Sequence, residues 1–166
     1  MKTKDNLATA FAGESQANRK YLCYAEQAEK EGHALIARLF RATAEAETIH
    51  AFNEFKAKGG VGTTLDNLQA AKDGESYEFT EMYPPMIKTA EEEGDKNAAR
   101  IFHLANEAEK VHAKLYGEAI ESLGKESAGD YDYYLCPMCG FIHKGTAVPE
   151  ASCPICGAKP TLFKKF

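Results

Sequence analysis

Two copies of a Glu-x-x-His motif are the residues of this chain best suited to metal chemistry. They are Glu47-Thr48-Ile49-His50 and Glu109-Lys110-Val111-His112. A step of three residues turns an α-helix by about 300°, so the carboxylate and the imidazole leave one face about a turn apart. Each motif can therefore hold one metal ion, and a pair of such helices can hold two.

The two motifs belong to an internal repeat. Its matching segments, in chain order, are Gly13-Glu14-Ser15 with Gly74-Glu75-Ser76, Glu31-Gly32 with Glu93-Gly94, and the two Glu-x-x-His motifs. The offset is 61 residues at the first segment and 62 at the later ones, so the second copy contains one extra residue before its Glu-Gly. A helix absorbs an extra residue most simply as a π-bulge, and Pro84-Pro85 would tolerate one because proline removes backbone donors.

The apolar pattern predicts four helices in two antiparallel hairpins. We expect helices over residues 5–31, 34–58, 74–93 and 95–123, with Gly32 and Gly59-Gly60 as stop signals. Residues 61–73 are expected to form a crossover with a short helical turn over 65–71, capped by Thr64. Short links within the hairpins and one long crossover between them predict an all-α ferritin-like four-helix bundle.

A small C-terminal segment carries four of the five cysteines. They are Cys136, Cys139, Cys153 and Cys156. Two Cys-x-x-Cys knuckles, each followed by glycine, predict one tetrathiolate metal site, and the ligands alone do not separate iron from zinc. We expect a bundle over residues 1–124, a linker over 125–133 and a metal-stapled domain over 134–166. Cys23 stands alone in the first helix and is expected to be a bystander.

Composition excludes several classes of partner. The chain has 166 residues and a net charge of −5, which argues against nucleic acid or an anionic membrane as the main partner. No apolar stretch approaches the ~20 residues that a membrane span needs. The first residues lack the apolar segment of a signal peptide, so we expect a cytoplasmic setting with reduced thiols.

The bundle motifs together match the parts of a di-iron carboxylate site, in which two helices each give a Glu and two others each give Glu-x-x-His. The candidate ligands are Glu14, Glu47, His50, Glu75 or Glu78, Glu109 and His112. A single Glu-x-x-His is usually solvated surface, but two in register within a repeat are not. So many carboxylates could not share a core without cations, because desolvating one charge costs several kcal/mol. Oxygen-rich ligands with only two imidazoles favour iron or manganese over zinc or copper.

These motifs, with the stretch Glu81-Met82-Tyr83-Pro84, make the chain similar to the rubrerythrin family over nearly its whole length. The resemblance implies a non-haem di-iron centre in the bundle and a rubredoxin-type iron in the tail. It also implies a peroxidase that reduces hydrogen peroxide to water in oxidative stress defence. Electrons would come from a reduced nicotinamide cofactor through a partner reductase or rubredoxin.

The resemblance also implies a role for each candidate. Glu14 and Glu75 would be terminal ligands, and Glu47 and Glu109 would be bridging ligands. His112 would be a ligand of one iron. Alternative ligands of the other iron, exchanged between redox states, would be Glu78 and His50. Tyr21 and Tyr83 would hydrogen-bond to the ligand carboxylates.

The exchange has a physical basis in the repeat. Glu78 follows Glu75 by three residues, whereas Ala17 follows Glu14. One ion would therefore have a carboxylate and an imidazole competing for one position. The more highly charged oxidised iron favours the anionic oxygen, and ferrous iron accepts neutral imidazole more readily.

Other functions and several assemblies stay open. One alternative is a ferroxidase or iron-handling protein, although a storage protein needs no dedicated electron input. Another is a non-enzymatic interaction protein with a zinc-ribbon tail. We expect a homodimer or a higher oligomer, with exchange of helical hairpins through the crossover as an open alternative. The tail could serve its own irons or those of a neighbouring subunit.

Overall fold

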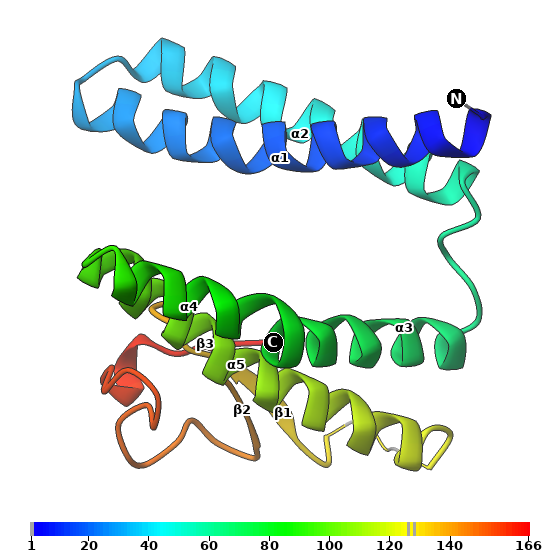
Figure 1. Ribbon diagram of the computed structural model, residues 1–166, viewed down its shortest axis with the longest axis vertical. Coiled ribbons are helices and arrows are strands. Elements are labelled where there is room, and N and C mark those ends of the chain that lie inside the picture. Colours follow the sequence, from blue (N-terminus) through cyan, green and yellow to red (C-terminus); the bar gives the residue numbers. More distant parts are fainter. Residues whose placement is uncertain (1, 126, 128) are drawn as a thin grey trace. The chain divides into compact units, whose positions relative to one another are not determined.

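The structure, a computed structural model, describes residues 2–125, 127 and 129–166. Its contacts divide the chain into two compact units, Met1–Gly62 and Thr63–Phe166. Figure 1 shows the helices of each unit and the small sheet near the C-terminus. Among the described residues, no helix is both long and apolar enough to cross a membrane.

The first unit is an antiparallel hairpin of α1 (Thr3–Lys30) and α2 (Ala34–Ala57) (Figure 1). Both helices agree with the predicted ranges to within two residues. Gly32, the predicted stop, has φ 83°, a left-handed conformation that favours glycine. The turn between the helices is therefore set by a local signal.

Alanines form the seam between these two helices. The buried residues of the hairpin are Ala25, Ala28, Ala37, Ala44 and Ala51. Small side chains let helices approach closely but give little register by themselves. The Asn18 side-chain amide supplies register, because its Nδ2 donates to the Ala44 carbonyl at 2.7 Å and to Thr48 Oγ1 at 2.9 Å.

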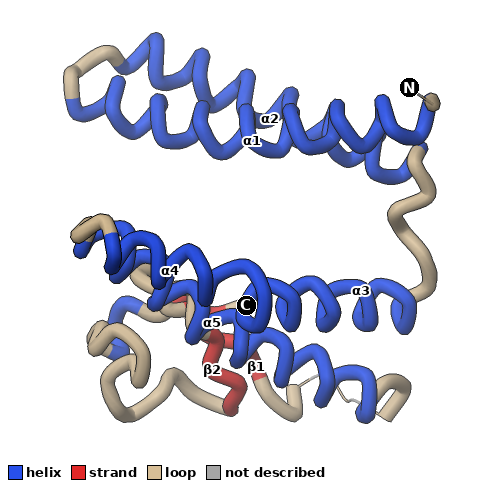
Figure 2. The backbone as a smooth tube through the Cα atoms, viewed as in Figure 1, coloured by secondary structure: helices blue, strands red, loops and turns tan. Residues whose placement is uncertain are grey.

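The second unit starts with a helical run of three pieces, α3 (Thr64–Tyr77), the π-helix η1 (Glu78–Met82) and α4 (Tyr83–Glu92). Figure 2 shows this run as helix from its first residue to its last. The π-helix lies in the interval where the repeat has its extra residue, so the predicted π-bulge is confirmed.

The predicted crossover was wrong in its extent. Helix α3 begins at Thr64, so most of residues 61–73 are helical and only residues 58–63 link α2 to α3. The cap is Thr63 rather than Thr64, and its Oγ1 accepts from the Asp66 amide at 3.2 Å. The Asp66 carboxylate accepts in return from the Thr63 amide at 3.0 Å, which completes a capping box. This local signal starts the helix ten residues earlier than the expected residue 74.

Helix α5 (Lys96–Ser122) packs against α3 and α4 and follows a tight turn. Its N-cap is Asp95, whose Oδ1 accepts from the amides of Asn97 and Ala98. The helix agrees with the predicted range to within one residue at each end. It carries the second Glu-x-x-His motif.

The C-terminal segment is a small antiparallel sheet. Strand β1 (Asp132–Leu135) lies between β2 (Ile142–Gly145) and β3 (Lys164–Lys165), and a 3-10 turn, η2 (Pro160–Leu162), precedes β3. The sheet contacts α5 through β2 and belongs to the same compact unit. The last two residues of the predicted linker 125–133 are already in β1, and residues 126 and 128 lie outside the described part. The predicted domain boundaries stay a prediction.

Candidate metal centres

The structure gathers predicted ligands into three clusters. Within each cluster the ligand atoms lie within 4.8 Å of one another. The clusters are Glu14, Glu47 and His50; Glu75, Glu109 and His112; and Cys136, Cys139, Cys153 and Cys156. Each helical hairpin thus carries one set of two carboxylates and one imidazole, and the sheet carries the thiols.

The first cluster joins α1 to α2. His50 Nδ1 lies 2.9 Å from Glu47 Oε2, so the i,i+3 spacing brings these groups together as the motif predicts. A hydrogen bond to the Glu47 carboxyl, then burial, and then repulsion from Glu47 and Glu54 raise the pKa of Glu14. Carboxylates that repel each other at such short range need a shared proton or a cation. The cluster therefore fits a metal ion.

Glu54 is a residue that the sequence analysis missed. Its Oε2 is shielded from solvent and has no hydrogen-bond partner among the described residues. A shielded carboxylate oxygen without a donor is costly, and a nearby cation would offset that cost. Glu54 follows Glu47 by seven residues, which is two helical turns, and this spacing was the available signal.

The second cluster joins α3 to α5 and is more enclosed. His112 Nδ1 lies 2.7 Å from Glu109 Oε2 and 3.6 Å from Glu75 Oε2. The His112 side chain is 17% exposed, against 54% for His50. Burial, followed by hydrogen bonding to and repulsion from the Glu109 carboxyl, raises the pKa of Glu75, and His112 opposes this rise. A bound cation would offset the repulsion between these two carboxyl groups, so this cluster also fits a metal ion.

Glu78 lies beside the second cluster but not within it. It is the first residue of the π-helix. Burial and then repulsion from Glu75 raise the pKa of Glu78, while His112 lowers it. The Glu78 carboxyl group is therefore close enough to interact electrostatically with both residues. The predicted exchange of Glu78 with His50 as a ligand stays a prediction.

The two predicted tyrosines lie in different surroundings. Burial and then the charges of Glu109, Glu78 and Glu75 raise the pKa of Tyr83, so its hydroxyl lies near the second cluster and stays protonated at neutral pH. Tyr21 contacts aromatic rings of the first hairpin, with its centroid 6.3 Å from that of Phe40. In the described residues neither tyrosine hydroxyl bonds to a carboxylate, and their roles stay predictions.

The four thiols form a cage. The Sγ atoms of Cys136 and Cys156 lie 3.6 Å apart, as do those of Cys139 and Cys153. A disulfide would need about 2.05 Å, whereas a tetrahedral site with metal–sulfur bonds of about 2.3 Å has sulfurs a little under 4 Å apart. Burial raises the pKa of Cys139, so a metal ion must displace that proton.

A glycine closes each knuckle, and its conformation explains why. Gly140 has φ 84° and Gly157 has φ 75°, both in the left-handed region. The Gly140 amide donates to the Cys136 carbonyl at 3.0 Å, and the Gly157 amide donates to the Cys153 carbonyl at 2.9 Å. The turns hold the two cysteines of each pair on the same side of the chain.

One hydrogen bond joins the second cluster to the thiol cage. His112 Nε2 donates to the Gly140 carbonyl at 2.8 Å. A carbonyl only accepts, so Nε2 carries the proton and Nδ1 keeps its lone pair for a metal ion. Spacing could not reveal this contact, because 28 residues separate the partners.

Two further contacts hold the sheet on α5. Lys144 Nζ lies 3.1 Å from Glu118 Oε2 and 4.1 Å from the centroid of the Tyr131 ring. Ala108 of α5 is 1% exposed and lies directly under Gly140, where an added Cβ would be 3.8 Å away. The position of the sheet on the helix therefore rests on packing, an ion pair and a hydrogen bond.

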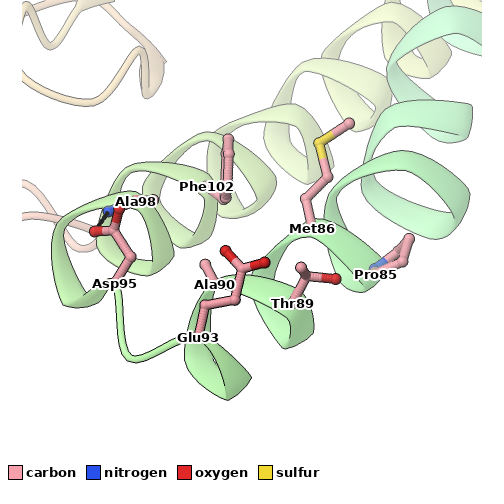
Figure 3. A pocket seen from close by; sticks show the side chains of 8 residues that line it. All are labelled: Pro85, Met86, Thr89, Ala90, Glu93, Asp95, Ala98 and Phe102. Atoms are coloured by element: carbon pink, nitrogen blue, oxygen red, sulfur yellow. Dashed lines mark hydrogen bonds between the residues drawn. The ribbon is translucent and has the colours of Figure 1, made fainter.

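Two hollows stand out among the described residues of the second unit. A cavity of about 520 Å³ between α3, α5 and the sheet has Glu75 and His112 on its wall. The other, of about 440 Å³, lies between α4 and α5 (Figure 3) and contains none of the predicted site residues. Its acidic residues are Glu93 and Asp95, and Asp95 already caps α5. Only the first hollow adjoins a metal cluster.

Comparison with known proteins identifies the family. A family model described as "Rubrerythrin" matches residues 5–120, and one described as "Rubrerythrin, rubredoxin-like domain" matches residues 134–164. The chain belongs to the rubrerythrin family. Rubrerythrin-2 of Clostridium acetobutylicum is 39% identical, with 99% of this chain and 96% of the relative covered. Nigerythrin of Nitratidesulfovibrio vulgaris is 38% identical, with 99% and 86% covered.

Solved structures of nigerythrin are similar to this chain as well. Those of its partially reduced state and of its fully reduced, all-ferrous state each match with a TM-score of 0.60 and 36% identity. Each covers 100% of this chain and 87% of the nigerythrin chain. The predicted fold class, a ferritin-like bundle followed by a rubredoxin-like domain, is confirmed. The predicted cofactors, two iron ions in the bundle and one in the tail, are confirmed as those of the rubrerythrin family.

Proposed function

We propose that this rubrerythrin is a peroxidase that reduces hydrogen peroxide to water in oxidative stress defence. The observation that carries the proposal is the bond from His112 to Gly140, which joins a carboxylate–imidazole cluster to the thiol cage. A protein that only stores iron or only binds a partner has no use for such a connection. Peroxide needs two electrons and two protons to give two water molecules.

The residues of the chain have separable tasks in this reaction. When bound, the two bundle irons supply the two electrons and the Lewis acidity that peroxide cleavage needs. The carboxylates of both clusters balance the charge of the metals. The hydroxyl of Tyr83 stays protonated because its pKa is raised, so it can donate a hydrogen bond beside Glu109. No nucleophile from the protein is required.

With iron bound by its four cysteines, the tail would return electrons one at a time. Its route runs from the thiol cage through Gly140 to the Nε2 of His112, and the Nδ1 of His112 faces the cluster. The tail rests on α5 of its own chain, which supports the proposal that it would serve an ion held by Glu75, Glu109 and His112 of that chain. We propose that a nicotinamide-dependent reductase or a rubredoxin reduces the tail.

The exchange of Glu78 and His50 forms part of the same proposal. The π-helix begins at Glu78, and the carboxyl group is already within electrostatic reach of Glu75. Oxidised iron would take this carboxylate and reduced iron the imidazole. Both irons would then be close to fully ligated when oxidised, which disfavours a long-lived activated oxygen species.

Steady-state turnover on one iron-loaded sample tests the proposal. Peroxide should oxidise the reduced protein much faster than dioxygen does. Deleting residues 130–166 should leave a single oxidation by peroxide intact and abolish turnover driven by the reductase. Comparable rates with peroxide and dioxygen would favour the ferroxidase, and full turnover without the tail would reject the relay.

Three finer points complete the proposal. Visible absorption of the oxidised protein tests the tail, because an iron tetrathiolate is coloured and a zinc tetrathiolate is not. A homodimer or higher oligomer is part of the proposal, and the link of residues 58–63 makes exchange of hairpins between copies worth testing by mass measurement. A cytoplasmic setting fits the free thiols of the cage.

A further inference from the structure

The cavity of about 520 Å³ that adjoins the second metal cluster has mostly apolar walls. These walls come from α3, α5 and the small sheet, which all belong to the second compact unit. Glu75 and His112, two of the predicted metal ligands, form part of the wall. Its aliphatic residues are Leu68 from α3, Leu115 and Ala119 from α5, and Leu135 and Ile142 from the sheet.

The tail contributes its share of the wall through the register of its sheet. Leu135 of β1 pairs directly with Ile142 of β2. Residues that face each other across two strands point to the same side of a sheet, so both side chains can line one cavity. The tail therefore shapes the space beside the cluster as well as holding the thiol cage.

This cavity is larger than hydrogen peroxide requires. A water molecule takes about 30 Å³ in the liquid, so a molecule with two oxygen atoms needs roughly twice that space. Protein interiors are close-packed and contain few voids larger than a water molecule. A volume of about 520 Å³ lies instead in the range of sites that hold organic ligands, roughly 300–1,000 Å³.

The internal repeat shows that the second cluster has apolar neighbours where the first has polar ones. Three and four residues after the histidine of its motif, α2 has Asn53 and Glu54. At the same two positions α5 has Leu115 and Tyr116, which both line the cavity. The two clusters have the same kinds of ligand, so this difference concerns what lies beside the metal rather than the metal itself.

The cavity wall carries little charge away from the cluster. Among the described side chains that line it, only Glu75 and His112 can be charged near neutral pH. Burial, followed by a hydrogen bond with Tyr131, raises the pKa of Tyr133 to about 12, so its hydroxyl stays neutral. An apolar group can therefore enter without covering a free charge, and each buried CH₂ favours binding by about four-fold.

We propose that this cavity binds the organic group of an alkyl or arylalkyl hydroperoxide, which is reduced at the second cluster. This inference rests on the proposed peroxidase function and names a second class of substrate for the same site. The oxygen–oxygen bond of the hydroperoxide breaks, two electrons are taken from the bundle irons, and each oxygen receives one proton. The products are the corresponding alcohol and one water molecule.

Binding of cumyl alcohol, the product from cumene hydroperoxide, is the first test because it needs no turnover. Calorimetric titration of the iron-loaded chain should detect this binding. Ala119→Phe puts a ring into the cavity and should weaken the binding at least ~10-fold. Lys114→Phe is the matched control, since it adds the same ring at an exposed position of α5 outside the cavity wall. No binding to the wild type, or equal affinities of the wild type and both variants, would overturn the proposal.

Oxidation of the reduced, iron-loaded chain is the second test. Stopped-flow rates with cumene hydroperoxide and with hydrogen peroxide give a ratio, which Ala119→Phe should lower at least ~10-fold and Lys114→Phe should leave unchanged. Oxidation of the wild type by hydrogen peroxide but not by cumene hydroperoxide would overturn this inference and leave the peroxidase proposal standing. Binding of cumyl alcohol without oxidation by either peroxide would reject the peroxidase proposal and this inference together. If Ala119→Phe fails to fold, Leu68→Phe fills the cavity from α3 and takes its place in both tests.

Discussion

Replacing Asn18 by alanine should both destabilise the first hairpin and disturb its metal cluster. The Asn18 amide makes two hydrogen bonds to α2, at 2.7 Å to the Ala44 carbonyl and at 2.9 Å to Thr48 Oγ1. Each is worth about 1 kcal/mol. The Ala44 carbonyl keeps a partner in the variant, since Thr48 Oγ1 also donates to it at 3.2 Å. No buried group is orphaned, so the loss should stay at about 1–2 kcal/mol.

The same contact should affect metal affinity. Asn18 follows Glu14 by one helical turn and fixes the register that brings Glu14 to Glu47. We expect the first cluster of Asn18→Ala to bind a divalent ion about tenfold more weakly, since a tenfold change corresponds to about 1.4 kcal/mol. The second cluster should be unaffected, because its ligands come from other helices. Titration with ferrous or cobaltous ion would show one site weakened and one intact.

Urea unfolding of the metal-free chain measures the stability change, and Asn6→Ala provides the matched control. Asn6 is an exposed asparagine of the same helix, so this change brings the gain in helix propensity without the loss of a contact to α2. A double-mutant cycle with Thr48→Val should give a coupling of about 1 kcal/mol. Equal stabilities of the two alanine variants, or a coupling near zero, would refute this account of the register.

Three further outcomes are expected. Lys144→Ala removes the ion pair to Glu118, which is worth up to about 1 kcal/mol. Reoxidation of the tail iron, followed by stopped flow, should therefore slow several-fold at low salt and little at high salt. No change at low salt would mean that this ion pair does not hold the tail on α5. Thr63→Ala should lower the free energy of unfolding by about 1 kcal/mol. Hydrogen bonds from Thr63 hold the pKa of Asp66 below its usual 3.8. The stabilisation by this pair is therefore present above pH 3.8 and is lost as the pH falls through the lower pKa of the folded state. Unfolding curves should show that the difference in free energy of unfolding between wild type and variant disappears only in that acid range. Glu78→Ala should keep two bundle irons by metal analysis but lose much of the peroxidase turnover, and crystal structures of the oxidised and reduced wild type with identical iron ligands would reject the exchange.

Local patterns predicted much of this protein because helices and metal knuckles are local structures. Glu109 and His112 meet because three residues make nearly one turn, whatever the rest of the chain does. The extra residue of the second repeat predicted the π-helix before Tyr83, since a helix in register on both sides must absorb it within. The early start of α3 could also have been predicted from the sequence, because Thr63 and Asp66 form a capping box. The sequence analysis instead expected a long crossover at this place.

Contacts between distant segments were decided only by the tertiary structure. The bond from His112 to Gly140 and the ion pair of Glu118 with Lys144 cross 28 and 26 residues of sequence. Neither has a spacing rule, because they depend on where the sheet comes to rest on α5. The shielded oxygen of Glu54 is similar, since burial depends on the packing of two helices. The sequence by itself predicted which residues could bind metal, because ligand spacing on a helix or in a knuckle is local. Packing decided which candidate cluster lies beside the tail, because the sheet comes to rest on α5.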